Sequence, residues 1–153
     1  MDVTGATTSG SYQLTAREPG ASHPILNGPF RPNNESLSGK YWGEDGGSTC
    51  HLTVIPSGAT VLSYNTHNAA ESTSDSYATM IVHDEKGFFW AGDGGFAAGD
   101  PTSVWTDIYP SRNNNGYPVV HTVHTPSPAY TSFVYANVIA WAIDWVNANR
   151  ANW

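Results

Sequence analysis

The feature that most constrains the fold is a pair of apolar segments, residues 77–83 and 87–91, on either side of a short charged stretch. The stretch reads Asp84-Glu85-Lys86-Gly87, and its glycine can adopt the positive φ angle that a short hairpin loop requires. Both apolar segments are rich in β-branched and aromatic residues, which favour strands. We therefore predict a β-hairpin over residues 77–91.

Three further elements follow from the pattern of residue types. Residues 51–55 and 59–64 alternate and contain β-branched side chains, so we predict two strands joined by a turn at Pro56-Ser57-Gly58. Ser127 followed by Pro128 is typical of a helix N-terminus, and we predict a helix over residues 128–147. Its segment 138–143 is apolar on nearly all sides, which predicts that more than one face is covered, by a sheet and by something else such as a second subunit. Trp141 and Trp145 lie on one stripe of this helix, which indicates core or a subunit interface.

The length of 153 residues suits a single domain, residues 1–153, with a sizeable core. The first ten residues are small and polar, and we expect them to be frayed. The predicted fold class is α/β, with a mixed sheet of about five strands and a long C-terminal helix packed on it. The alternative is an α+β arrangement.

Charge and hydropathy limit the classes of partner. The chain has a net charge of −7 and only six Lys and Arg residues, so it lacks the positive charge that dominates binding to nucleic acids and to anionic membranes. No stretch approaches the roughly 18 apolar residues of a membrane span, and the N-terminus lacks the features of a signal peptide. We expect a soluble chain that binds neither nucleic acid nor membrane. The single cysteine, Cys50, cannot form an intrachain disulfide.

The candidate site begins where the second apolar segment ends. Trp90 is followed by Gly92-Asp93-Gly94-Gly95, which predicts a carboxylate at a strand end that a ligand can reach. A carboxylate beside an aromatic ring can accept sugar hydroxyl groups while the ring stacks on the sugar. The alternative is that Asp93 caps a turn through hydrogen bonds to the following amides.

A second corner, residues 42–47, has a similar order of residue types. Trp42 is followed by Glu44, Asp45 and two glycines, so both corners could contribute to one ligand site. Asp93 with Glu44 or Asp45 would also supply the two carboxylates of a glycoside hydrolase, which lie about 5 to 9.5 Å apart. Acids in a glycine-rich loop are otherwise solvated turn residues. The histidine spacing matches no metal motif, and we predict neither a metal nor a cofactor.

Four segments resemble a known superfamily: His23-Pro24-Ile25-Leu26-Asn27-Gly28, the strand pair around Val54 and Leu62, residues 87–96, and the helical residues 134–143. Their order is similar to the C-terminal half of class I glutamine amidotransferase-like domains of the ThuA-like branch. The resemblance implies a flavodoxin-like α/β domain without its N-terminal half, which carries the nucleophilic cysteine. Asp93 stands near where the catalytic histidine would fall, and neither Cys50 nor any other residue matches the strand-to-helix turn that carries the nucleophile. No catalytic residue is therefore carried over from the family.

The missing half has a physical consequence. A sheet edge and a helix face that it normally covers would be bare, and exposed edges and apolar faces favour pairing. We therefore expect a homo-oligomer or a more antiparallel sheet. For function we predict a non-catalytic binding or interaction module that recognises a neutral polar ligand such as a glycan. The alternatives are a small hydrolase that uses Asp93 with Glu44 or Asp45, and a structural homo-oligomer.

Overall fold

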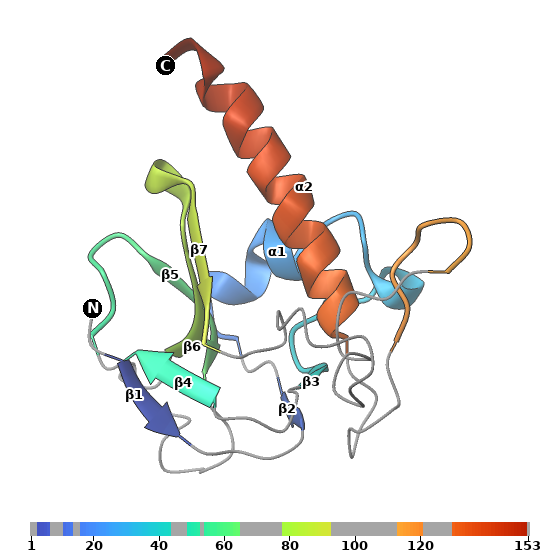
Figure 1. Ribbon diagram of the computed structural model, residues 1–153, viewed down its shortest axis with the longest axis horizontal. Helices are drawn as coiled ribbons and strands as arrows, with labels where there is room; N and C mark the ends of the chain where they lie inside the picture. The colour runs from blue at the N-terminus through green and yellow to red at the C-terminus, as the bar shows by residue number, and fades with distance from the viewer. Residues whose placement is uncertain are drawn as a thin grey trace, which may run out of the picture.

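The computed structural model describes residues 3–6, 11–13, 16–43, 49–52, 54–64, 78–92, 113–120 and 130–152. All strands of the described residues precede the long helix α2 (Thr131–Asn149) (Figure 1). The remaining elements are, in chain order, β1 (Val3–Ala6), β2 (Ser11–Gln13), η1 (Gly20–Ser22), α1 (Pro24–Asn27), η2 (Pro32–Asn34), β3 (Tyr41–Gly43), β4 (Thr49–Leu52), β5 (Thr60–Tyr64), β6 (Ala78–His83), η4 (Asp84–Lys86), β7 (Phe88–Ala91) and η6 (Arg150–Asn152).

The central strand of the sheet, β6, forms a hairpin with β7. The two strands pair antiparallel, from Met80 opposite Ala91 to His83 opposite Phe88. All six residues of β6 are buried, as expected for a central strand. The one-turn helix η4 joins the strands, and Gly87 closes the loop at a φ angle of 60°. The predicted hairpin is therefore confirmed, including the role of its glycine.

Strand β5 pairs antiparallel with the other edge of β6, so that β5, β6 and β7 form a three-stranded antiparallel sheet. The predicted turn before β5 is confirmed: Gly58 has a φ angle of 84°, and the amide of Ala59 donates to the carbonyl oxygen of Pro56 at 3.0 Å. Strand β4 meets β6 at one residue pair, Leu52 opposite Ala78, and β1 pairs with β4. Strands β2 and β3 form a separate pair.

The fold combines helix and sheet, as predicted, but the expected mixed sheet is not found in the described residues. Every strand pair there is antiparallel. Short turns such as η4 can join antiparallel strands, whereas parallel strands need a crossover of a dozen or more residues. This is the arrangement that the α+β alternative describes. Two boundaries also differ: β4 ends at Leu52, and residues 3–6, within the range expected to fray, form β1.

The core lies between the sheet and the two helices. Met80 and Val82 of β6 face the helices, where they join buried residues of α1 and of the first turns of α2: Ile25, Leu26, Phe133, Val134 and Tyr135. Alternation along the strand places Ile81 on the opposite face, in a smaller cluster with Leu52 and Ala78. The N-terminal part of α2 is thus the part that the core holds.

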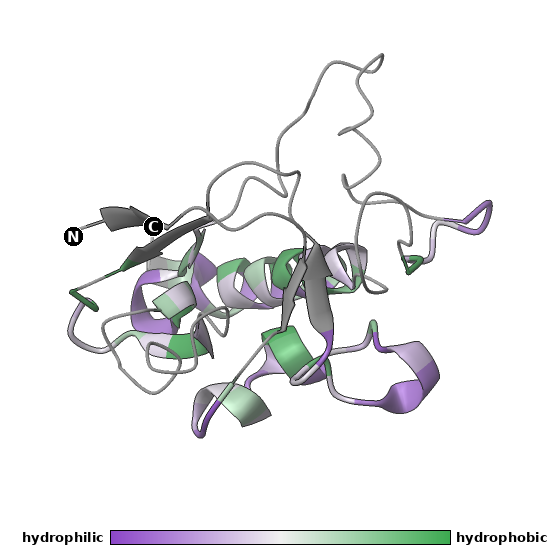
Figure 2. Cartoon of the chain, turned by 90° about the horizontal axis from the view of Figure 1, so that it is seen from below, coloured by the Kyte–Doolittle hydropathy of each residue, from purple (hydrophilic) through white to green (hydrophobic). Residues whose placement is uncertain are grey.

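The C-terminal part of α2 extends beyond the strands (Figure 1). Hydrophobic and weakly polar residues follow one another along most of the helix (Figure 2), but the core does not reach all of them. Ile139, Ile143 and Val146 are 60%, 57% and 42% exposed. The apolar run is longer than the core beneath it, so the described residues of this chain do not cover this part of α2, and the prediction that a second subunit covers it stays a prediction. The helix begins at Thr131 rather than at the predicted residue 128.

Candidate functional site

Most of the predicted site residues lie wholly or partly outside the described residues. Asp93, Glu44 and Asp45 lie outside the described residues, and so does the side chain of Trp42, whose backbone is in β3. The site built on Asp93 therefore stays a prediction, both as a glycan site and as the paired carboxylates of a hydrolase.

Trp90 is the one predicted site residue whose side chain is described. It lies in β7, opposite Ile81, and is half-buried. Its ring packs against the smaller hydrophobic cluster of Leu52, Ala78 and Ile81. The indole thus contributes to the packing of the sheet, whatever else it contacts.

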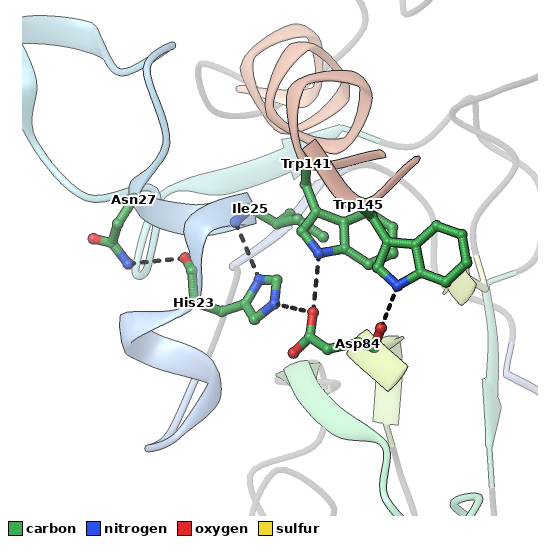
Figure 3. A network of polar contacts seen from close by, with 6 residues as sticks. All are labelled: His23, Ile25, Asn27, Asp84, Trp141 and Trp145. Atoms are coloured by element: carbon green, nitrogen blue, oxygen red, sulfur yellow. Dashed lines mark hydrogen bonds and ion pairs between the residues drawn. The ribbon is translucent and has the colours of Figure 1, made fainter. Parts of the chain in front are cut away.

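Among the described residues, a connected polar cluster lies around Asp84, at the tip of the hairpin (Figure 3). His23 precedes α1, Asp84 begins η4, and Trp141 and Trp145 project from α2. Asp84 Oδ1 lies 3.2 Å from His23 Nε2 and accepts a hydrogen bond from Trp141 Nε1 at 2.9 Å. Trp145 Nε1 donates to the backbone oxygen of Asp84. One acidic residue therefore ties together α1, the hairpin and α2.

The hydrogen bonds fix the tautomer of His23. Its Nδ1 accepts the amide of Ile25 at 3.1 Å, so in the neutral ring Nε2 carries the proton and donates it to Asp84. Both ring nitrogens are thus engaged, and the His23 side chain is only 7% exposed. A histidine in this state cannot take a proton from a ligand without losing its bond to α1. The His23–Asp84 pair therefore positions the helices and is unsuited to serve as a catalytic base.

A second polar contact, at Asn137, holds α2 against the segment after α1. Asn137 is 1% exposed, and its Nδ2 donates to the carbonyl oxygens of Ile25 at 3.1 Å and Phe30 at 3.0 Å. Its Oδ1 accepts the amide of Phe30 at 2.9 Å. Gly28 allows this approach, because a Cβ atom there would lie 2.6 Å from Asn137 Oδ1. The Asn137 side chain therefore joins α2 to α1 and to the loop after it through three hydrogen bonds.

The sequence identifies part of this cluster. The spacing of Trp141 and Trp145 predicts a buried or interface stripe, and the structure places both side chains half-buried against the hairpin. The acceptor that they share was missed, because Asp84 was interpreted only as a turn residue. The available signal was the need of a buried indole N–H for a hydrogen-bond partner, although sequence alone does not say which acceptor supplies it.

The exposed face of α2 forms a shallow apolar groove. Its lining residues lie in successive turns of the helix: Ile139, Ala142, Ile143, Val146 and Asn147. None of them carries a charge. The spacing i, i+3, i+4 and i+7 places the four apolar side chains on one stripe. This face is an exposed apolar surface of a kind that marks interaction sites.

Two other types of site are absent from the described part of the chain. No group of three or more His, Cys, Asp and Glu side chains is placed so that it could hold a metal ion there. None of the helices in that part combines the length and the apolar character needed to cross a bilayer.

Comparison with protein-family models, with curated proteins and with solved structures finds no match. The resemblance to amidotransferase-like domains therefore stays a prediction from the four segments that suggest it.

Proposed function

We propose that this protein is a non-catalytic interaction module that binds a helical protein segment on the outer face of α2. The observation that carries the proposal is the exposure of Ile139, Ile143 and Val146 on a helix whose opposite side is fixed to the core. Exposed apolar side chains are individually common, but a continuous stripe of them on one element is characteristic of docking surfaces.

The way in which α2 is held supports this proposal. Asn137 fixes the helix to the loop after α1, and Asp84 accepts a hydrogen bond from Trp141, one turn further along. Trp145 adds a contact to the hairpin another turn on. The exposed stripe is therefore presented by a helix that is already formed and oriented, which lowers the entropic cost of binding.

The chemistry of the stripe favours a helical ligand. Ile139, Ile143 and Val146 have the i, i+4 and i+7 spacing with which one helix anchors on another. The margin of the groove is the neutral amide of Asn147. A surface without charge offers little to a highly charged ligand, whereas the apolar side of an amphipathic helix would remove all three side chains from water.

A catalytic function gains less support from the described residues. The His23–Asp84 pair has no free ring nitrogen with which to move a proton. The hydrolase hypothesis rests on Asp93, Glu44 and Asp45, which lie outside the described residues.

The proposal is tested by replacing Ile139 and Ile143 together with serine. Ile and Ser have similar helix propensities, and exposed side chains contribute little to the core, so we expect the melting temperature to change by less than about 2 °C. Binding of a dye such as ANS, which reports exposed apolar surface, should fall. Val54→Ser is the matched control, because Val54 is also 57% exposed but lies between β4 and β5.

Two results would contradict the proposal. A fall of the melting temperature by many degrees would mean that the stripe belongs to the core. Equal dye binding by the double variant and the wild type would mean that the stripe is not the apolar surface that the folded protein presents.

A further inference from the structure

We infer that the helix which docks on this face is α2 of a second copy of this chain, so that the protein forms a two-fold symmetric dimer through an antiparallel helix pair. This inference rests on the proposed function and names its partner. It is carried by the order of side chains along the exposed stripe and by the distribution of charge over the chain.

The stripe is complementary to itself when it is turned by two-fold symmetry. A two-fold axis that passes between Ala142 and Ile143 places Ala142 of each copy opposite Ile143 of the other. The same axis places Ile139 opposite Val146. A small side chain then faces a large one at the centre, and two large side chains pair at each end, which is the interdigitation that close helix packing requires. All three exposed aliphatic side chains face apolar partners in this arrangement.

The charge of the protein makes this face the preferred place for two copies to meet. The net charge is −7, so two copies repel each other over most approaches. The residues that line the α2 groove are all neutral. Asp144 is the one acidic residue of α2, and it is not among the residues that line the groove. The apolar stripe therefore contributes attraction where like charges do not meet.

The dimer should be weak. The stripe is one face of a few helical turns and is smaller than a standard stable interface, but no element has to fold or reorient before it docks. We expect a dissociation constant between about 10 µM and 1 mM, so the monomer predominates in dilute solution. Self-association should be visible by sedimentation equilibrium over that concentration range.

The decisive variants place charges beside the axis. Ile143→Asp brings two carboxylates together in the dimer and Ile143→Lys brings two ammonium groups together, so each variant alone should lose at least about tenfold in affinity. An equimolar mixture of the two should recover association, because unlike charges then face each other. Val54→Asp is the matched control, since Val54 has the same 57% exposure as Ile143 and lies off the stripe. Its dissociation constant should equal that of the wild type.

The outcomes are separable from those of the proposed function. Loss of association in each Ile143 variant, recovery on mixing and an unchanged Val54 control support the dimer. A wild type that stays monomeric at 1 mM refutes the dimer, and dye binding that still depends on Ile139 and Ile143 would then leave the interaction module standing with another partner. A dimer that the Ile143 variants do not weaken refutes this interface. A monomer whose dye binding does not depend on the stripe refutes both proposals.

Discussion

Replacing Asn137 by alanine should remove the contact that joins α2 to the segment after α1, and the loss can be calculated from the structure. The side chain makes three hydrogen bonds to backbone groups of Ile25 and Phe30, and it is 1% exposed. Each such bond contributes about 1–1.5 kcal/mol, and the backbone groups that remain would be left without their partner. The three together amount to about 3–4.5 kcal/mol.

One opposing effect has to be subtracted. Alanine is a better helix former than asparagine by about 0.6 kcal/mol, which stabilises the variant. We therefore expect the free energy of unfolding to fall by about 2.5–4 kcal/mol, and the melting temperature by about 5–15 °C for a chain of this length. That is a large part of the stability of an ordinary domain, about 5–15 kcal/mol.

The measurement is urea unfolding at equilibrium, followed by far-UV circular dichroism and by tryptophan fluorescence. Asn147→Ala is the matched control, because it is the same change on the same helix at an exposed position, where the side chain accepts one hydrogen bond, from Arg150. It carries the same gain in helix propensity, so we expect its free energy of unfolding to be within about 0.5 kcal/mol of the wild type or above it.

Asn137→Asp separates the donors from the acceptor. The carboxylate can still accept the amide of Phe30 but cannot donate to the two carbonyl oxygens, and it brings a negative charge close to both. It should destabilise the protein at neutral pH at least as much as alanine does. The reasoning is refuted if Asn137→Ala lies within 1 kcal/mol of Asn147→Ala, or if Asn137→Asp is as stable as the wild type.

Three further changes give independent tests. Gly20→Ala should lower the free energy of unfolding by about 3 kcal/mol or more in urea titrations, because the new Cβ atom would lie 1.9 Å from the carbonyl oxygen of Val61; a variant of near wild-type stability would contradict this packing. Gly87→Ala combines a φ angle of 60° with a Cβ atom 2.7 Å from the indole of Trp145, so we expect a loss of about 2–3 kcal/mol and a change in tryptophan fluorescence; an unchanged spectrum would speak against the contact. A hydrogen bond to the carboxylate of Glu35 raises the pKa of Lys40 above 10.5. The contribution of this ion pair to stability is therefore present at neutral pH and is lost as the pH rises through the raised pKa. The Lys40–Glu35 ion pair lies at the protein surface, so Lys40→Met should lower the free energy of unfolding by less than about 0.5 kcal/mol at pH 7. It should not change the free energy of unfolding at a pH well above that pKa, and thermal unfolding at both pH values measures the difference.

The candidate site shows how far sequence reasoning reached for function. A glycine-bounded acid after an apolar run is visible in the sequence, and so Asp93 became the predicted ligand residue. In the described structure, the polar contacts instead centre on Asp84, and the exposed apolar side chains lie on the outer face of α2. Asp84 is separated from Trp141 by 57 residues, and no local pattern relates an acid in a turn to an indole that far along the chain.

What the sequence by itself determined is the local structure. The β6–β7 hairpin follows from two strand-forming segments and Gly87, the turn before β5 follows from Gly58, and the long apolar run after Pro128 gives the helix α2. In each of these, the conformational preference of a few neighbouring residues is enough to select the structure. The sequence also predicts that Trp141 and Trp145 lie on one stripe of this helix.

Only the tertiary structure decided which apolar residues are covered and which polar groups meet. Phe133 and Ile143 are both apolar residues of α2, but the core buries the first and ends before the second. Asn137 meets the carbonyl oxygen of Ile25, 112 residues away, because packing brings α1 against α2. Burial and long-range hydrogen bonds depend on where other segments lie in space, so the period of one helix predicts an apolar face but not what covers it.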